Sequence, residues 1–144
     1  MRVTAQSDYA LRVLIYVGLR GDEASQVAEI AARYRISKSH LTKVVWRLSQ
    51  AGFLATTRGR GGGLRLAMTP EEINLGDVMR AVEGFSQLVE CFGPDNKCVI
   101  TPACAARRMF REAHDAFFAV FDKYTLADLL ARREGLLPIL QLSA

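Results

Sequence analysis

Three cysteines lie close together in the second half of this chain, and their type and spacing make them the strongest candidates for chemistry. Cys91, Cys98 and Cys104 are the only cysteines in the sequence. Residues 93–96 are turn formers, so we expect Cys91 and Cys98 on an irregular loop. Pro102 suits the first turn of a helix, which would place Cys104 near the positive end of a helix dipole and favour its thiolate. Three converging thiolates are typical of a soft-metal or iron–sulfur site that lacks one ligand.

Other interpretations of the cysteines remain open at this point. A disulfide with one free thiol is possible, although nothing in the sequence marks the chain as secreted. The cysteines could also be buried structural residues, because cysteine is often found in protein cores. A structural zinc site usually has paired C-x2-C spacing, whereas the gaps here are six and five residues. An iron–sulfur cluster is therefore the favoured hypothesis.

Composition and charge narrow the class of protein. At 144 residues, half of them hydrophobic, the chain is long enough for one domain with a real core. Residues 1–70 hold eleven Lys/Arg against four Asp/Glu, whereas residues 71–144 hold eight against eleven. The basic first half suggests a polyanionic partner. We see no secretion signal and no apolar run of membrane-spanning length, and we expect a cytoplasmic protein without a membrane partner.

The elements that would position these residues begin with a helix–turn–helix pattern. A helix is predicted over residues 7–19, with Asp8 and Arg12 as an i,i+4 pair on one face. A second helix, capped by Ser25, is followed by a turn at residues 34–36. Ser37 then caps a helix over residues 38–51. The polar face of that helix is typical of one that enters a DNA major groove, and it carries Lys38, Ser39, His40, Thr42, Lys43 and Arg47.

A glycine- and arginine-rich hairpin follows this pattern. Residues 53–57 and 64–68 are predicted strands, and the tip between them includes Arg58, Arg60, Gly61 and Gly62. Such a tip can approach a duplex closely and place guanidinium groups in a minor groove. A phosphate-binding P-loop is excluded, since no Lys-Ser/Thr follows and the next element is a strand. A helix–turn–helix with a basic hairpin is a winged helix.

The second half is predicted to be helical. One helix starts at Thr69 and ends near residue 84, a long helix runs over residues 102–122, and a short one covers residues 125–130. The long helix has a wide apolar stripe that one small chain has little left to cover, so we expect a two-fold homodimer. The expected fold is mainly α with a small β-hairpin wing. Its expected parts are a DNA-binding domain (1–84), a cluster-binding loop (85–104), and a dimerisation helix with a C-terminal extension (105–144). No constellation typical of an enzyme active site is present.

Several motifs resemble the iron–sulfur regulators of the IscR superfamily, and within it the nitric-oxide-sensing repressors. The matching segments cover almost the whole chain and comprise residues 7–16, residues 58–66 of the wing, residues 73–80, Ile100-Thr-Pro-Ala-Cys104 and Tyr124-Thr-Leu-Ala-Asp-Leu129. In the IscR branch of this superfamily a histidine follows the third cysteine by three residues. Arg107 occupies that position here, which argues against the IscR branch.

The resemblance implies a set of roles. Cys91, Cys98 and Cys104 would hold a [4Fe–4S] cluster, or alternatively a [2Fe–2S] cluster. Asp8 from the partner subunit would be the fourth ligand, with Arg12 beside it. The resemblance also implies a repressor whose dimer binds a palindromic double-stranded operator. Nitric oxide would attack the cluster, release the DNA and derepress nitric-oxide detoxification genes. An iron- or redox-sensing regulator of the same fold is the alternative.

Overall fold

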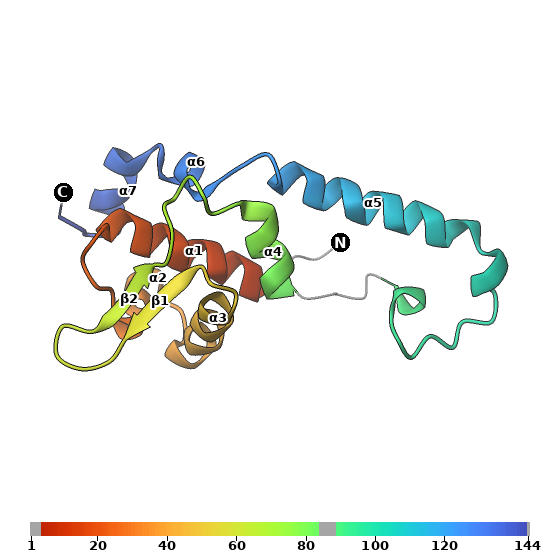
Figure 1. Cartoon of the computed structure of the whole chain (residues 1–144), viewed down its shortest axis with the longest axis horizontal. Coiled ribbons are helices and arrows are strands. Elements are labelled where there is room, and N and C mark those ends of the chain that lie inside the picture. Colours follow the sequence, from red (N-terminus) through yellow and green to blue (C-terminus); the bar gives the residue numbers. More distant parts are fainter. Residues whose placement is uncertain (1–3, 84–88, 144) are drawn as a thin grey trace.

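Seven α-helices and one β-hairpin make up residues 4–83 and 89–143, the part of the chain that the computed structural model describes. In chain order the elements are α1 (Ala5–Arg20), α2 (Val27–Tyr34), α3 (Lys38–Gln50), β1 (Leu54–Thr57), β2 (Gly63–Leu66), α4 (Leu75–Glu83), the 3₁₀ helices η1 (Glu90–Phe92) and η2 (Thr101–Ala103), α5 (Ala105–Phe121), α6 (Leu126–Leu130) and α7 (Arg133–Ile139). Figure 1 shows a body from which α5 extends. We call residues 89–121 the arm. The predicted mainly helical fold with a hairpin wing is confirmed.

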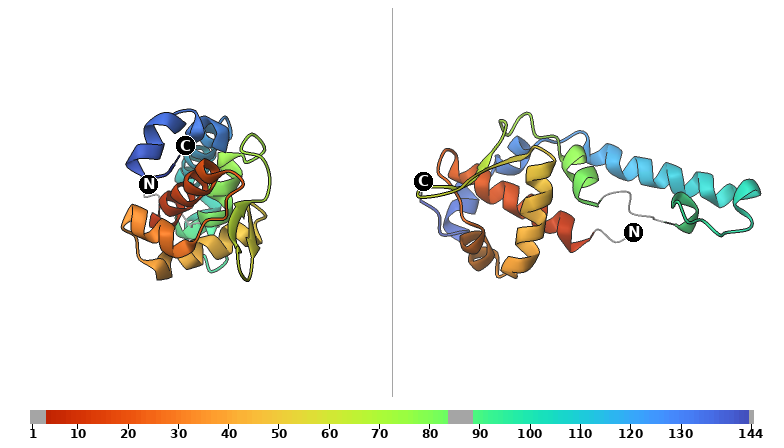
Figure 2. Two further views of the ribbon diagram at one scale, coloured as in Figure 1. Left: turned by 90° about the vertical axis from the view of Figure 1, so that its left-hand side faces the viewer. Right: turned by 60° about the horizontal axis from the view of Figure 1, so that its bottom comes forward.

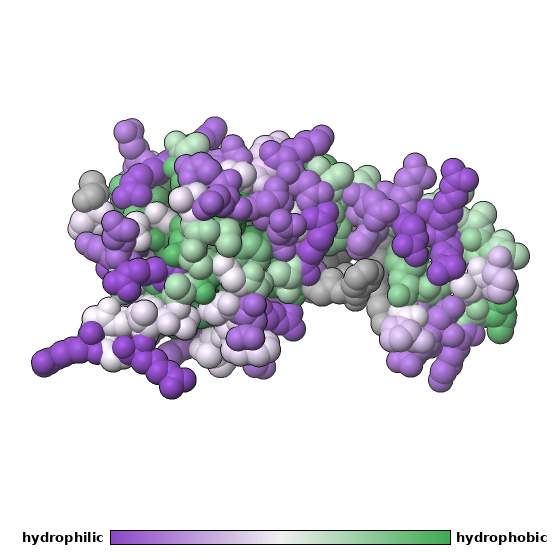
Figure 3. Space-filling view, viewed as in Figure 1, coloured by the Kyte–Doolittle hydropathy of each residue, from purple (hydrophilic) through white to green (hydrophobic). Residues whose placement is uncertain are grey.

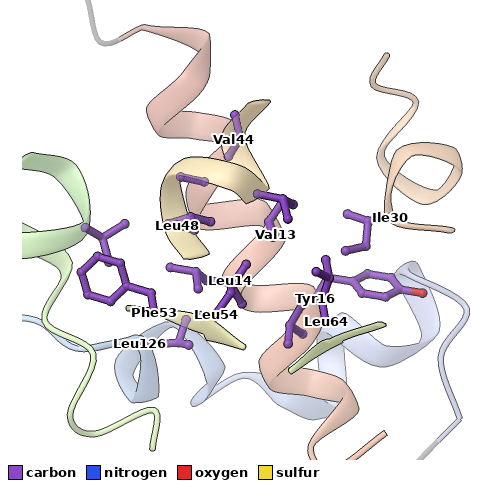
Figure 4. Packing of buried hydrophobic residues seen from close by; sticks show 14 of the residues in the cluster. Val13, Leu14, Tyr16, Ile30, Val44, Leu48, Phe53, Leu54, Leu64 and Leu126 are labelled. Carbon is purple, nitrogen blue, oxygen red and sulfur yellow. The ribbon is translucent and has the colours of Figure 1, made fainter. Parts of the chain in front are cut away.

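Helix α1 lies at the centre of the body. Its apolar face, which includes Val13, Leu14 and Tyr16, is fully buried (Figure 4). Helices α3, α4 and α6 all pack against it. Gly18 allows α6 to come close, because a β-carbon at this position would lie only 2.8 Å from Leu130 Cδ1. Helix α1 therefore fixes the positions of α3, α4 and α6.

The predicted helix–turn–helix is formed by α2 and α3. Arg35 ends α2 in the left-handed conformation, with φ of 55°, and Ser37 precedes α3. The buried face of α3 carries Leu41, Val44, Val45 and Leu48. Ser25, which we expected to cap α2, is instead buried and exchanges two backbone hydrogen bonds with Leu64 of the wing. That prediction was wrong because α2 begins two residues later, after Gln26.

Two other helices begin later than the sequence suggested. Thr69 does not start α4. Its backbone N–H and hydroxyl both donate to Glu72 Oε2 at 2.9 Å, which closes a separate turn and lowers the pKa of Glu72. The cap of α4 is Asn74, whose Oδ1 accepts from the backbone N–H of Gly76 and Asp77. Likewise α5 begins at Ala105, after η2, so Cys104 occupies the N-cap in an extended conformation and not the first turn.

The C-terminal segment returns to the body (Figure 2). Thr125 and Asp128 form a capping box that starts α6, whose Leu126 is fully buried. Helix α7 adds Leu137, and Leu140 follows it into the same core. The C-terminal extension is thus part of the body.

An ion pair at the residue directly after α5 links the base of the arm to the body, and it predicts that acid weakly destabilises the fold. Arg80 of α4 donates two hydrogen bonds to the Asp122 carboxylate at 2.6 and 2.7 Å, and lies over the Phe118 ring of α5. The Arg80 hydrogen bonds lower the pKa of Asp122, so the pair stabilises the fold above the unfolded pKa and its contribution is lost as the pH falls through the folded value. We expect Asp122→Asn to flatten the acid limb of thermal stability against pH, whereas Asp95→Asn in the arm loop should not. An unchanged acid limb would contradict this.

Candidate functional site

The three cysteines line one pocket in the arm. The pocket has a volume of about 190 Å³ and is lined by Val89, Glu90, Cys91, Cys98, Cys104, Ala106, Arg107 and Phe110. All three cysteines are half-buried and free, so no disulfide joins them. Within residues 4–83 and 89–143 the structure does not draw three metal-ligating side chains close enough to hold a single metal ion. The predicted residues share a pocket but do not form a closed one-metal site.

Side-chain hydrogen bonds shape the loop that carries these cysteines. Asn96 Oδ1 accepts from the backbone N–H of Cys98 at 3.0 Å, and Thr101 Oγ1 donates to the Cys98 carbonyl at 2.8 Å. The carboxylate of Glu90 accepts from the Lys97 backbone N–H at 2.8 Å. Arg111 of α5 lies over the Phe92 ring, with 5.1 Å to its centroid. These contacts keep Cys91 and Cys98 beside the start of α5, where Cys104 lies.

Asp8 and Arg12 lie in the body, on α1. Arg12 Nη2 is 2.7 Å from Asp8 Oδ2, and its Nε donates to Asp8 Oδ1 at 3.1 Å, so the predicted i,i+4 pair is present with two contacts. Arg12 also lies over the ring of Tyr34, whose pKa burial raises to about 12. The Asp8 carboxylate is exposed and is not among the residues that line the cysteine pocket of its own chain.

The end of α4, directly before the segment that leads to the cysteines, contacts both α1 and α3. Glu83 Oε1 accepts hydrogen bonds from the Thr4 backbone N–H, the Thr4 hydroxyl and the Ser7 hydroxyl, all at the start of α1. One residue earlier, the Val82 carbonyl accepts from Arg47 Nη1 of α3. A shift of the end of α4 would therefore displace both α1, which carries Asp8, and α3.

Helix α3 presents most of the predicted DNA-contacting residues to solvent. Lys38, Ser39, His40, Thr42 and Lys43 are exposed. Arg47 differs, because it is half-buried and its guanidinium is engaged by the Val82 carbonyl. Sequence reasoning missed Trp46, whose side chain is 63% exposed on the same face as Ser39 and Lys43. The signal was available in the i, i+3, i+4, i+7 spacing of residues 39, 42, 43 and 46, but an aromatic residue in that pattern is normally assigned to the core.

The hairpin wing has the predicted strands and an exposed basic tip. Strands β1 and β2 pair antiparallel, with Leu54 opposite Leu66 and Thr57 opposite Gly63. Arg58 and Arg60 are exposed at the tip. Gly61 has a φ of 79°, and a β-carbon at Gly62 would lie 2.4 Å from the Thr57 carbonyl oxygen, so the tip requires glycine at both positions. Gln26 Nε2 donates to the Gly62 carbonyl at 2.6 Å and holds the tip against α2.

The arm exposes much apolar surface. Met109 is 67% exposed and Val120 is 51% exposed on α5, and Phe118 is the only buried residue among the described residues of that helix. Figure 3 shows hydrophobic surface at the outer end of the arm, where Val99 and Ile100 are also exposed. His114 is half-buried against the Phe118 ring, at 4.8 Å between centroids, and does not line the cysteine pocket. Among the described helices, none is both long and apolar enough to span a membrane.

Comparison with known proteins identifies the family. Residues 3–132 match the model of the Rrf2 family, described as an iron-dependent transcriptional regulator. The chain is 47% identical to the HTH-type transcriptional regulator NsrR of Bacillus subtilis, over 99% of both chains. It is 46% identical to NsrR of Geobacillus kaustophilus, over 98% of this chain and 97% of that one. The resemblance to these regulators that the motifs indicated is confirmed.

Solved structures agree with this assignment. The global cysteine regulator CymR of B. subtilis superposes with a TM-score of 0.70 at 29% identity, over 91% of this chain and 97% of that one. IscR of T. potens has the same fold, with a TM-score of 0.71 at 23% identity, over 91% of this chain and 87% of that one. The exposed polar face of α3, the basic wing and the family match all indicate a DNA-binding regulator. The relatives are transcriptional regulators, which confirms the expectation that the chain is not an enzyme. The chain therefore belongs to the Rrf2 family of iron-dependent transcriptional regulators that bind DNA through a winged helix–turn–helix.

Proposed function

We propose that this protein is a homodimeric repressor that senses nitric oxide through an iron–sulfur cluster. The observation that carries the proposal is the single pocket lined by Cys91, Cys98 and Cys104. We assign the cluster as [4Fe–4S], with [2Fe–2S] as the alternative. Three half-buried free thiols fit such a cluster, because a cluster spreads its ligands over several iron atoms and does not require them to meet at one metal ion.

The fourth ligand in this proposal is Asp8 of the partner subunit. The cysteine pocket of a chain lacks a fourth thiol and does not include its own Asp8. The Asp8 carboxylate is exposed, so a second copy can reach it. Arg12 holds that carboxylate through two contacts and would orient one oxygen toward the cluster. A carboxylate is a harder ligand than a thiolate, so the iron that it holds would be the labile one.

The proposed dimer forms through α5. Five exposed residues of this helix repeat at alternating spacings of three and four, as in a coiled-coil seam. They are Ala106, Met109, Ala113, Ala116 and Val120. The alanines allow two helices to approach closely, and pairing would cover the apolar side chains that the body leaves exposed. A second copy of α5 is the natural partner for this seam.

Charge favours an antiparallel arrangement of the two helices. The first two turns of α5 carry Arg107, Arg108 and Arg111, which form no salt bridge with any other described residue. Cations near a helix N-terminus are unfavourable to the helix dipole. The acidic residues Glu112 and Asp115 follow later in the helix. A parallel partner would place the two arginine clusters side by side, whereas an antiparallel partner keeps them apart and carries each cysteine pocket toward the partner's body.

The proposed organisation keeps three parts, which are a DNA-binding domain (1–84), a cluster loop (85–104) and a dimerisation segment (105–144). The boundary at residues 84 and 85 lies outside the described residues. In the dimer, two α3 helices would enter successive major grooves of a palindromic operator. Lys38, Ser39, His40, Thr42 and Lys43 would face the DNA, while the Arg47 guanidinium holds α3 to the Val82 carbonyl of α4. Arg58 and Arg60 would enter the flanking minor grooves.

Derepression follows from the contacts at the end of α4. When bound, the cluster supplies iron atoms that nitric oxide attacks. The start of α1, which carries Asp8, is hydrogen-bonded to Glu83, and the end of α4 that carries Glu83 also holds Arg47 of α3. A change in the cysteine loop would thus move both recognition helices, weaken operator binding and switch on genes for nitric-oxide detoxification.

The test is a gel shift with anaerobically reconstituted protein and a duplex that the protein itself selects from a random library. We expect the visible iron–sulfur absorption and the shifted band to disappear together as nitric oxide is titrated. Equal affinity of the reconstituted, nitric-oxide-treated and cluster-free protein would refute the proposal.

A sensor of iron or redox poise is the second candidate, and the description of the family as iron-dependent favours it. This candidate predicts that an iron chelator or mild oxidation releases the operator at concentrations that leave the nitric oxide response small. The same gel shift, repeated with a chelator in place of nitric oxide, separates the two functions.

The role of Asp8 can be tested by complementation between subunits. We expect Asp8→Ala to accelerate loss of the visible band at least about tenfold, since even outer-shell changes have effects of this size. A mixed dimer of Asp8→Ala and Cys98→Ser chains contains one complete site, made of the cysteines of the first chain and Asp8 of the second. Its remaining cluster should decay at the wild-type rate. Decay as fast as in the Asp8→Ala homodimer would contradict a ligand from the partner.

A further inference from the structure

Trp46 occupies an unexpected place on the recognition helix. It is the only tryptophan in the chain, and 63% of its side chain is exposed. Ser39, Thr42 and Lys43 are exposed at the spacing that places them on the same face of α3. The opposite face is the one buried in the core. The indole is therefore directed away from the body, on the surface that faces DNA.

A pocket of about 410 Å³ adjoins this indole. It is lined by Trp46, Thr42, Lys43 and Arg47 of α3 and by Gln6 from the first turn of α1, and its surface is mostly apolar. The guanidinium of Arg47 is directed to the Val82 carbonyl, so its alkyl stem is the part available to the pocket. Gln6 Oε1 is buried without a hydrogen-bond partner among the described residues. The pocket thus combines an apolar surface with the cation of Lys43 and the amide of Gln6.

The position of Trp46 along α3 indicates what fills this pocket. Trp46 lies eight positions after Lys38, which at a rise of 1.5 Å per residue is about 12 Å, close to the width of the major groove. When the start of α3 reaches the base edges, Trp46 lies at the groove rim, where the sugar–phosphate backbone passes. Lys43 supplies the positive charge that suits a phosphate, and the indole suits the apolar face of a deoxyribose.

We propose that the pocket formed by Gln6, Thr42, Lys43, Trp46 and Arg47 receives the DNA backbone at the rim of the major groove. Trp46 packs on a deoxyribose, and Lys43 pairs with a neighbouring phosphate. The contact carries no base information, so it contributes equally on every sequence and fixes how far α3 is inserted.

The single tryptophan makes the test direct. The cluster-free full-length protein is titrated at low salt with two random-sequence duplexes of equal length, one rich in A·T and one rich in G·C. Emission from Trp46 should change on binding, and its quenching by acrylamide should fall. We expect Trp46→Ala to weaken binding to both duplexes by the same factor, roughly tenfold, as for loss of one large apolar contact.

Controls separate this contact from a general loss of fold or charge. Ile139→Ala removes another exposed apolar side chain, from α7, and should bind like the wild type. Lys43→Ala should reduce the slope of log affinity against log salt by about one, whereas Trp46→Ala should leave the slope unchanged. Unchanged emission, an unchanged affinity of Trp46→Ala, or a loss confined to the A·T-rich duplex would overturn the proposal. Because cluster-free protein is used, failure of the nitric oxide proposal would not affect the result.

Discussion

Serine at any one of the three cysteine positions is expected to abolish the visible iron–sulfur absorption of the reconstituted protein. A serine hydroxyl has almost the size of a thiol but does not ionise near neutral pH, so it is a poor replacement for a thiolate ligand. Cys98→Ser is the most informative of these variants, because Cys98 lines the pocket. Its backbone N–H and carbonyl are hydrogen-bonded to Asn96 and Thr101, and these bonds do not depend on the side chain at position 98. The loop should keep its shape while the pocket loses a ligand.

The same variant should lose specific DNA binding. If the cluster holds the dimer in its operator-binding arrangement, then affinity for the selected operator should fall at least about 100-fold, toward non-specific binding. Affinity for random-sequence duplex should be unchanged, since the basic surfaces of α3 and the wing are intact. Visible absorption measures the loss of the cluster, and gel shifts with the operator and with the random-sequence duplex measure the two affinities. Val99→Ser is the matched control, because Val99 is 90% exposed in the same loop and does not line the pocket. A Cys98→Ser protein that keeps the absorption band would exclude Cys98 as a ligand.

A glutamate in the middle of the α5 seam is expected to separate the dimer. Ala113 is exposed in the single chain, so Ala113→Glu should not disturb the fold of the monomer. In the proposed pair it faces the partner helix, where a carboxylate would be buried without a counter-ion. Sedimentation velocity should show a monomer at concentrations where the wild type is a dimer. Operator affinity should fall by roughly 10² to 10⁴, because two linked half-sites become one.

Two further variants complete this experiment. Ala32→Glu adds the same charge at an exposed position of α2 and should remain dimeric. In a background with serine at all three cysteines, a mixture of Met109→Cys and Val120→Cys chains reports orientation. An antiparallel pair cross-links only between the two different chains, whereas a parallel pair cross-links each with itself. A dimeric Ala113→Glu protein, or self-linked chains, would contradict the proposed seam or its direction.

The helices and the wing were predictable because their signals are local. The buried face of α3 and the two strands follow from apolar spacing and glycine positions, and both agree with the structure. Helix starts were less predictable, because several capping residues compete over a few positions. Thr69 with Glu72 resembles a helix start but closes a separate turn, while Asn74 caps α4.

Side-chain direction on an exposed face depended on the tertiary structure. Sequence spacing alone placed Arg47 on the DNA side of α3, but the open carbonyl of Val82 at the end of α4 attracts its guanidinium. Trp46 shows the reverse case, in which a residue type normally found in cores is exposed. The direction of Arg47 could not be read from α3 by itself, because it depends on where the end of α4 lies.

The sequence by itself determined the candidate ligands and most of the element types of this protein. Three cysteines within one short stretch, cations at helical spacing and a glycine–arginine hairpin tip are properties of residue type and local period. Only the tertiary structure decided that the cysteines share one pocket, that Asp8 lies in a different part of the same chain, and that α5 leaves its seam uncovered. The cysteine pocket is built by side-chain contacts within residues 89–111, whereas the positions of α1 and of α5 depend on contacts between segments far apart in the chain. Such contacts are selected by the burial of a common core, and no local pattern encodes them.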